Sequence, residues 1–161
     1  MLLHDLILDR VATHGNRPAL LRGDEMLDYT ALAEELHSAA RGLVALGLRP
    51  GERVGIYLNK RTEGVVSFFA ANLAGGVFVP IYPVLKAPQV QHILNDCNVA
   101  SLVTSVAHAS GLLDALGNCP ALRDVITVVA PADGALLPAH IEQLTWADLC
   151  KLKKAGSAFG R

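Results

Sequence analysis

The chain has 161 residues, of which 52% are hydrophobic and 18% are charged, and its formal net charge is -1. This length and composition predict a folded domain with a buried core and exclude an intrinsically disordered chain. The balanced charge and the 5% aromatic content argue against a nucleic-acid-binding protein, because such proteins neutralise phosphates with clustered Lys and Arg or stack bases on aromatic rings.

Helical spacing of apolar residues predicts a first helix over residues 2–14, and a hairpin follows over residues 19–29, with its turn at Gly23-Asp24. Thr30 is expected to cap the next helix, because a hydroxyl can accept a hydrogen bond from the first turn. Gly47 is expected to end that long helix.

From Arg53 onward, short apolar runs alternate with helical patterns. This alternation is typical of a parallel sheet with right-handed crossovers. We therefore predict an α/β fold, in which a layered, mainly parallel sheet is flanked by helices and preceded by the hairpin. The strands are expected over residues 53–59, 77–81, 100–105 and 123–130, and the helices over residues 60–76, from Ala87, over 106–117 and around 145–149.

Residues 64–85 form an uncharged segment that is long enough to span a bilayer. Gly75-Gly76, Pro80 and Pro83 would break the second half of such a helix. A buried helix followed by a buried strand uses the same residues without this penalty, so we expect no membrane span.

The pair Gly75-Gly76 raises the question of a phosphate-binding loop. Dinucleotide loops follow a strand and precede a helix, whereas this pair follows a predicted helix and precedes a strand. A Walker loop also needs a Lys and a Ser or Thr where Val77 and Phe78 stand. We interpret Gly75 as the left-handed residue that ends the helix, and Gly76 as the residue that allows a tight turn into the sheet.

The three cysteines, Cys97, Cys119 and Cys150, are odd in number, and no two of them have CxxC spacing. A disulfide framework or a zinc site is therefore not expected, and reduced thiols favour a cytoplasmic location. The six histidines are scattered without metal-ligand spacing. The N-terminal MLLHDLILDR has no basic leader, which argues against a signal peptide.

The segment LAGGVFVPIYPVLK resembles the second core motif of the adenylate-forming superfamily, L-x-x-G-A-x-x-x-P-x-x-P. The order of the flanking motifs also matches the N-terminal part of AMP-forming acyl-CoA synthetases, over roughly residues 2–130. Leu27, Tyr29 and Leu32 fill the family's pattern L-x-Y-x-x-L. Its pattern G-x-x-x-G-D-R-V-A-I is filled by Gly47, Gly51, Arg53, Val54 and Ile56, with Glu52 in place of Asp. The segment HILNDCNVASLVTS resembles the next helix and strand.

The resemblance implies an enzyme of fatty acid metabolism or a related ligase, which activates a carboxylic acid with ATP and Mg²⁺ and transfers the acyl group to CoA. The family's phosphate loop, magnesium-binding Glu, ribose-binding Asp and late Lys all lie beyond the matched region, and the terminal KKAGSAFGR does not replace the phosphate loop. This chain is therefore expected to be an inactive scaffold without catalytic residues, which binds no cofactor tightly.

The domain organisation expected from the resemblance is an incomplete α/β subdomain over residues 1–150 and a loose tail over residues 151–161. Its partner would be the remainder of the ligase domain, and its uncovered apolar faces predict self-association. An acyl-AMP ligase, an aryl-CoA ligase and an amino-acid adenylation module fit the same motifs. The alternative from a different class is a self-sufficient α/β binding or interaction domain without adenylation activity.

In several CoA ligases of this family, the loop after the motif strand contacts the phosphates of CoA. The corresponding loop here spans residues 82–86, so Lys86 and Tyr82 are the candidate CoA-binding residues, although Val84 stands where some relatives have Arg. An exposed lysine that opens a helix is the simpler interpretation of Lys86. Lys60-Arg61 also lies between a strand and a helix, where anions bind, but a charged loop that starts a helix is favoured there.

Overall fold

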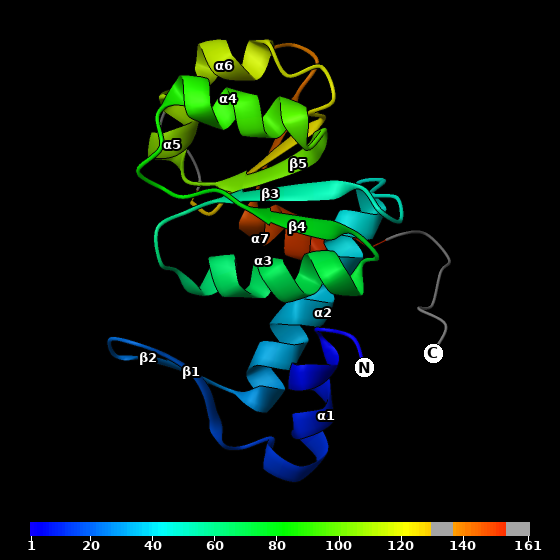
Figure 1. Cartoon of the computed structure of the whole chain (residues 1–161). Coiled ribbons are helices and arrows are strands. Elements are labelled where there is room, and N and C mark those ends of the chain that lie inside the picture. The colour runs from blue at the N-terminus through cyan, green and yellow to red at the C-terminus, as the bar shows by residue number, and fades with distance from the viewer. Residues whose placement is uncertain (130–136, 154–161) are drawn as a thin grey trace.

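The computed structural model of the chain describes residues 1–129 and 137–153. Its centre is a five-stranded, fully parallel sheet with the strand order β4-β3-β5-β6-β7, as Figure 1 shows. The predicted α/β fold is therefore confirmed. The strands are β3 (Arg53–Tyr57), β4 (Val77–Pro80), β5 (Val99–Thr104), β6 (Asp124–Thr127) and β7 (Glu142–Thr145).

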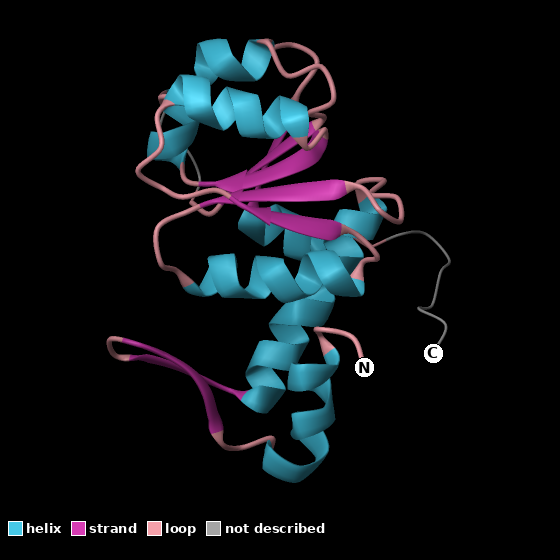
Figure 2. Ribbon diagram, in the orientation of Figure 1, coloured by secondary structure: helices cyan, strands magenta, loops and turns pink. Residues whose placement is uncertain are grey.

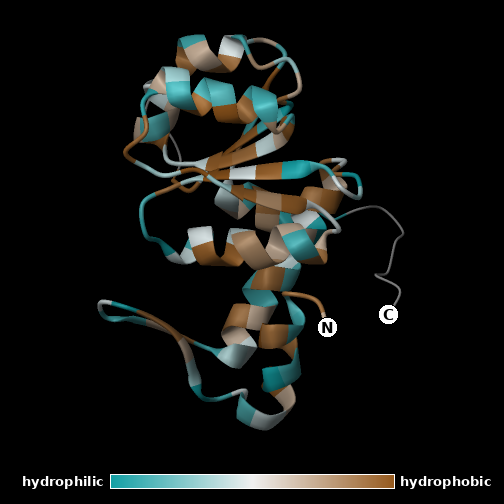
Figure 3. Cartoon of the chain, viewed as in Figure 1, coloured by the Kyte–Doolittle hydropathy of each residue, from teal (hydrophilic) through white to brown (hydrophobic). Residues whose placement is uncertain are grey.

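Helices cover both faces of the sheet (Figure 2). One face packs against α2 (Tyr29–Ala45), α3 (Thr62–Leu73) and α7 (Trp146–Lys151), and the other packs against α4 (Ala87–Asp96) and the short α6 (Leu113–Gly117). The strands in the centre are predominantly hydrophobic (Figure 3). Parallel strands that helices cover on both faces bury the side chains on each face of the sheet.

The N-terminal region adds α1 (Asp5–His14) and an antiparallel hairpin of β1 (Pro18–Arg22) and β2 (Glu25–Asp28). The predicted hairpin is confirmed, and Figure 1 shows that it projects away from the sheet. The expected cap at Thr30 is wrong. Asp28 caps α2 instead, because its carboxylate accepts a hydrogen bond of 2.8 Å from the backbone N–H of Ala31.

The two adjacent glycines form the junction between α3 and β4, as predicted. Gly75 has a φ of 83°, a conformation that suits glycine. The Gly76 N–H donates to the carbonyl oxygen of Ala71 at 2.8 Å. A Cβ atom on Gly76 would lie 3.0 Å from the carbonyl oxygen of Glu52, so the chain turns into the sheet with little room for a side chain. Among the helices of the described ranges, none is long and apolar enough to cross a membrane.

Two expectations differ from the structure in the C-terminal half. The single helix predicted over residues 106–117 is two short helices, α5 (Val106–Ser110) and α6, which are separated at Gly111 and Leu112. Strand β7 was not predicted, because three of its four residues, EQLT, are polar and the strand lies at the edge of the sheet. The end of the strand predicted over residues 123–130, and most of the predicted C-terminal tail, lie outside the described residues.

Candidate functional site

The carboxyl ends of β3 and β5 form a topological switch point. After β3, the chain forms α3 and then β4, which pairs with one side of β3. After β4, it forms α4 and then β5, which pairs with the other side of β3. Helices α3 and α4 lie on opposite faces of the sheet (Figure 1). Open α/β sheets bind ligands at such an edge, so the loops that follow these strands define the candidate site.

A cavity of about 650 Å³ opens at this edge, between the hairpin and the ends of β3 and β4. Its volume lies within the range of small-molecule pockets, about 300–1,000 Å³. Most of the lining is apolar, with Ile56, Leu58 and Phe68 among the contributing side chains, and Lys60 and Arg61 add positive charge.

The two predicted CoA-binding residues lie in the loop after β4. The Tyr82 side chain is 66% exposed, and Tyr82 lines the cavity. Lys86 is exposed and directly precedes α4, where its backbone N–H donates to the Gln89 side-chain oxygen at 2.9 Å. In the described part of the chain, Lys86 is not among the residues that line the cavity. The structure therefore places both residues in one loop, with only Tyr82 on the cavity.

Tyr57, which sequence reasoning did not single out, reaches this loop from the end of β3. Its hydroxyl donates to the backbone carbonyl oxygen of Leu85 at 2.7 Å. Its ring stacks on the imidazole of His108, with ring centroids 4.3 Å apart. The available sequence signal was weak: a tyrosine at the end of an otherwise aliphatic strand.

The pair Lys60-Arg61 starts α3 at the mouth of the same cavity. The guanidinium of Arg61 lies 3.2 Å from the carboxylate of Glu63, in the first turn of the helix. Because this contact neutralises part of its charge, Arg61 fits the favoured interpretation of a charged loop that starts a helix.

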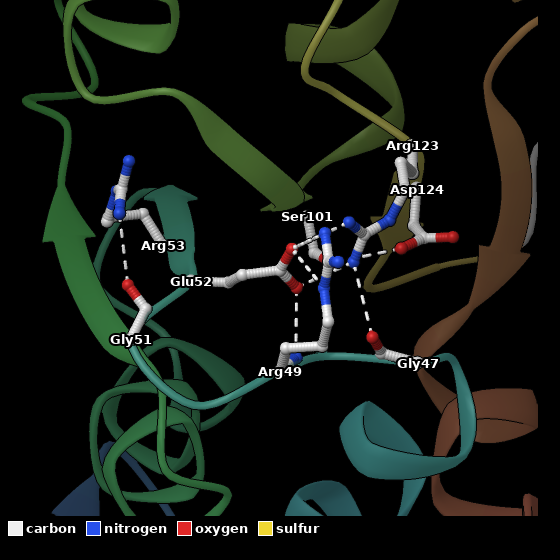
Figure 4. Close-up of polar contacts among 8 residues, drawn as sticks. All are labelled: Gly47, Arg49, Gly51, Glu52, Arg53, Ser101, Arg123 and Asp124. Carbon is white, nitrogen blue, oxygen red and sulfur yellow. Dashed lines mark hydrogen bonds and ion pairs between the residues drawn. The ribbon is translucent and has the colours of Figure 1, made fainter.

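The opposite edge of the sheet holds a denser ionic network, drawn in Figure 4. The two terminal guanidinium nitrogens of Arg123, Nη1 and Nη2, each donate to a different carboxylate oxygen of Glu52 at 2.8 Å. Arg49 contributes side-chain contacts of 3.0 and 2.8 Å to the same carboxylate. The hydrogen bonds from Arg123 hold the pKa of Glu52 well below its ordinary value. This network joins the loop before β3 to the start of β6.

Asp124 follows Arg123 and is only 4% exposed. Its carboxylate accepts a hydrogen bond of 3.0 Å from the Ser101 hydroxyl. Burial nevertheless raises the pKa of Asp124. A single hydroxyl donor from a neighbouring strand at the amino edge points to a structural role, because ligands of open α/β sheets bind at the carboxyl edge.

Two of the three cysteines, Cys119 and Cys150, lie in surroundings that disfavour a nucleophilic thiolate. Burial raises the pKa of Cys119, and it raises that of Cys150 to about 11. Thiols with raised pKa values carry little thiolate at neutral pH. Within residues 1–129 and 137–153, no three His, Cys, Asp or Glu side chains cluster closely enough to hold a metal ion.

The parallel sheet with a cavity at its carboxyl edge has the architecture of the open α/β domains that bind ligands. The family model described as AMP-binding enzyme matches residues 7–154, so the chain belongs to the AMP-binding enzyme family. It is 35% identical over 105 residues to the long-chain-fatty-acid--CoA ligase FadD15 of Mycobacterium bovis, a match that covers 65% of this chain and 18% of that protein.

A second curated relative is the N-(5-amino-5-carboxypentanoyl)-L-cysteinyl-D-valine synthase of Amycolatopsis lactamdurans. It is 33% identical over 134 residues, which cover 82% of this chain and 4% of that protein. The chain thus spans less than a fifth of the length of these two relatives.

Two solved structures share the fold over 98% of this chain. They are the anthranilate CoA ligase AuaEII in complex with anthranoyl-AMP, with a TM-score of 0.82 and 24% identity, and the coronafacic acid ligase of Pectobacterium brasiliense, with a TM-score of 0.86 and 15% identity. The matches cover 30% and 31% of those chains, respectively.

Proposed function

We propose that this chain is the N-terminal part of an ATP-dependent, AMP-forming carboxylic acid:CoA ligase. In this reaction, the substrate carboxylate attacks the α-phosphate of ATP, which forms an acyl-adenylate and releases pyrophosphate. The thiol of CoA then attacks the acyl carbon, which forms the thioester and releases AMP. Similarity to a fatty-acid CoA ligase and to two ligase structures supports this proposal, and a CoA ligase is favoured over an amino-acid adenylation module by the loop described next.

The observation that carries the proposal is the loop after β4 at the carboxyl edge of the sheet. Lys86 is exposed there, directly before α4. An ammonium group in this position can form charge-assisted hydrogen bonds with a phosphate of CoA. Tyr82 adds an exposed aromatic ring in the same loop. We assign both residues to the CoA side of the site.

The role proposed for the rest of the chain is that of a scaffold. The described residues contain no group of three or more His, Cys, Asp or Glu side chains that could hold Mg²⁺. We therefore assign none of these residues to metal binding in the reaction. The exposed Val84 and the apolar cavity are proposed to be covered by the remainder of the ligase domain, or by self-association of the isolated chain. We place the enzyme in the cytoplasm, where its free thiols stay reduced.

The test is Lys86→Ala in the complete ligase. Loss of one charge-assisted contact is expected to raise the KM for CoA about tenfold, more at low salt than at high salt. ATP–pyrophosphate exchange should stay unchanged, because it precedes the entry of CoA. The matched control is Lys151→Ala, which removes an exposed lysine from α7. An unchanged KM for CoA would remove Lys86 from the site.

A further inference from the structure

We infer that Tyr57 is a positioning residue, which fixes the loop over residues 82–86 and thereby directs Lys86 toward CoA. The inference rests on the proposed function for its CoA contact, but the anchoring of the loop stands on geometry alone. Tyr57 ends β3, and it is paired in register with Thr104 at the end of β5, so it lies at the switch point itself.

The anchoring contact acts on the peptide bond that connects Leu85 to Lys86. The carbonyl oxygen of this peptide accepts the Tyr57 hydroxyl at 2.7 Å, and its N–H, from Lys86, donates to the Gln89 side-chain oxygen at 2.9 Å. Because a peptide unit is planar, hydrogen bonds at both ends fix its orientation. This orientation sets the direction in which the chain enters Lys86.

The loop depends on this contact because few of its side chains are buried. Tyr82 and Val84 are 66% and 62% exposed, and Leu85 is half-buried. The backbone of the preceding residue, Ile81, is still tied to β3 through a hydrogen bond of 2.9 Å from its N–H to the carbonyl oxygen of Ile56. Beyond that point, the Tyr57 hydroxyl provides the hydrogen bond from the sheet to the loop among the described residues, and Leu85 adds apolar packing against the core.

Tyr57 is itself held from two sides. Its side chain is buried, with 4% exposure, and its ring stacks on His108 of α5 at an interplanar angle of 29°. Its backbone carbonyl oxygen accepts the Thr104 hydroxyl at 2.8 Å and lies 3.3 Å from Nδ1 of His108. The loop after β4 is therefore connected through one tyrosine to the first helix after β5.

The experiment uses Tyr57→Phe, which keeps the ring and its stacking and removes only the hydroxyl. Amide hydrogen exchange over residues 82–89 of this chain is expected to accelerate about tenfold, while the sheet keeps its protection, because only a local restraint is lost. Tyr29→Phe is the matched control, since the described residues offer no hydrogen-bond partner for the Tyr29 hydroxyl. Gln89→Ala, which removes the restraint at the other end of the peptide, should reproduce the acceleration.

In the complete ligase, Tyr57→Phe should raise the KM for CoA about fivefold and leave the KM for ATP and pyrophosphate exchange unchanged, as expected for a lost hydrogen bond. Unchanged exchange over residues 82–89 would overturn the anchoring of the loop, whatever the result with Lys86→Ala. Accelerated exchange with an unchanged KM for CoA would overturn the positioning role. In that case, Lys86→Ala decides separately whether the proposed CoA site survives.

Discussion

Glu52→Ala is predicted to be one of the more destabilising surface substitutions in this chain. The change removes the acceptor of both arginines in the network of Figure 4 and leaves Arg123, whose side chain is 38% exposed, without its carboxylate. Hydrogen bonds to charged groups contribute about 1.5–3 kcal/mol, and exposed ion pairs about 0–1 kcal/mol. Arg49 is 76% exposed, so most of the effect comes from the paired contacts with Arg123.

We therefore expect Glu52→Ala to lower the free energy of unfolding by about 2 kcal/mol at pH 7, after a discount for the partial exposure of Arg123. Urea unfolding followed by circular dichroism measures this difference. The matched control is Glu25→Ala, because Glu25 pairs with Arg22 at 3.0 Å with both side chains largely exposed. This control should change the free energy of unfolding by less than about 0.5 kcal/mol.

The effect should depend on pH with a definite sign. The pKa of Glu52 is lowered in the folded protein from its ordinary value of 4.5. The contribution of ionised Glu52 to the free energy of unfolding is therefore complete above about pH 5.5. It is lost as the pH falls through 4.5 toward the pKa of Glu52 in the folded protein. The wild-type protein and Glu52→Ala should converge in stability in acid. Equal effects of Glu52→Ala and Glu25→Ala at pH 7, or a difference that does not shrink in acid, would refute the reasoning.

Two further pairs of substitutions follow from backbone geometry. Asp28→Ala should lower the free energy of unfolding by about 1 kcal/mol, whereas Thr30→Ala should change it by less than half of that, since Asp28 caps α2; equal effects would contradict this assignment. Gly42→Ala should lower it by about 2–3 kcal/mol, because a Cβ atom there would clash with the backbone of Leu149. Gly64→Ala, whose Cβ atom would meet its nearest neighbour at 3.9 Å, should be neutral or stabilising; thermal unfolding compares the two, and similar losses would contradict the packing of α2 against α7.

Much of the architecture could be predicted because it depends on patterns of apolar and turn-forming residues over short stretches of the sequence. The alternation of apolar strands and helices gave the parallel sheet, and the position of Gly75-Gly76 between a helix and a strand gave the junction that the structure shows. The cap of α2 was misassigned because Asp28 and Thr30 are both good capping residues at neighbouring positions, and only the backbone conformation decides between them.

The contacts that define the two edges of the sheet could not be predicted, because they join residues that are distant in the sequence. The Tyr57 hydroxyl reaches a carbonyl 28 residues away, and Glu52 pairs with a guanidinium 71 residues away. Both contacts depend on the order and register of the strands, which local periodicity does not determine. The loop that carries Tyr82 and Lys86 was located through motif resemblance, and its contact with CoA stays a prediction.

The central proposal is that this chain supplies a scaffold for adenylation, while the groups that perform the chemistry lie in other parts of a longer ligase. ATP–pyrophosphate exchange measures adenylation directly and requires no acceptor thiol. With a panel of carboxylic acids, the 161-residue chain is predicted to show no exchange above background, whereas the complete ligase should exchange with its own acid. Acid-dependent exchange by the 161-residue chain alone would contradict the account.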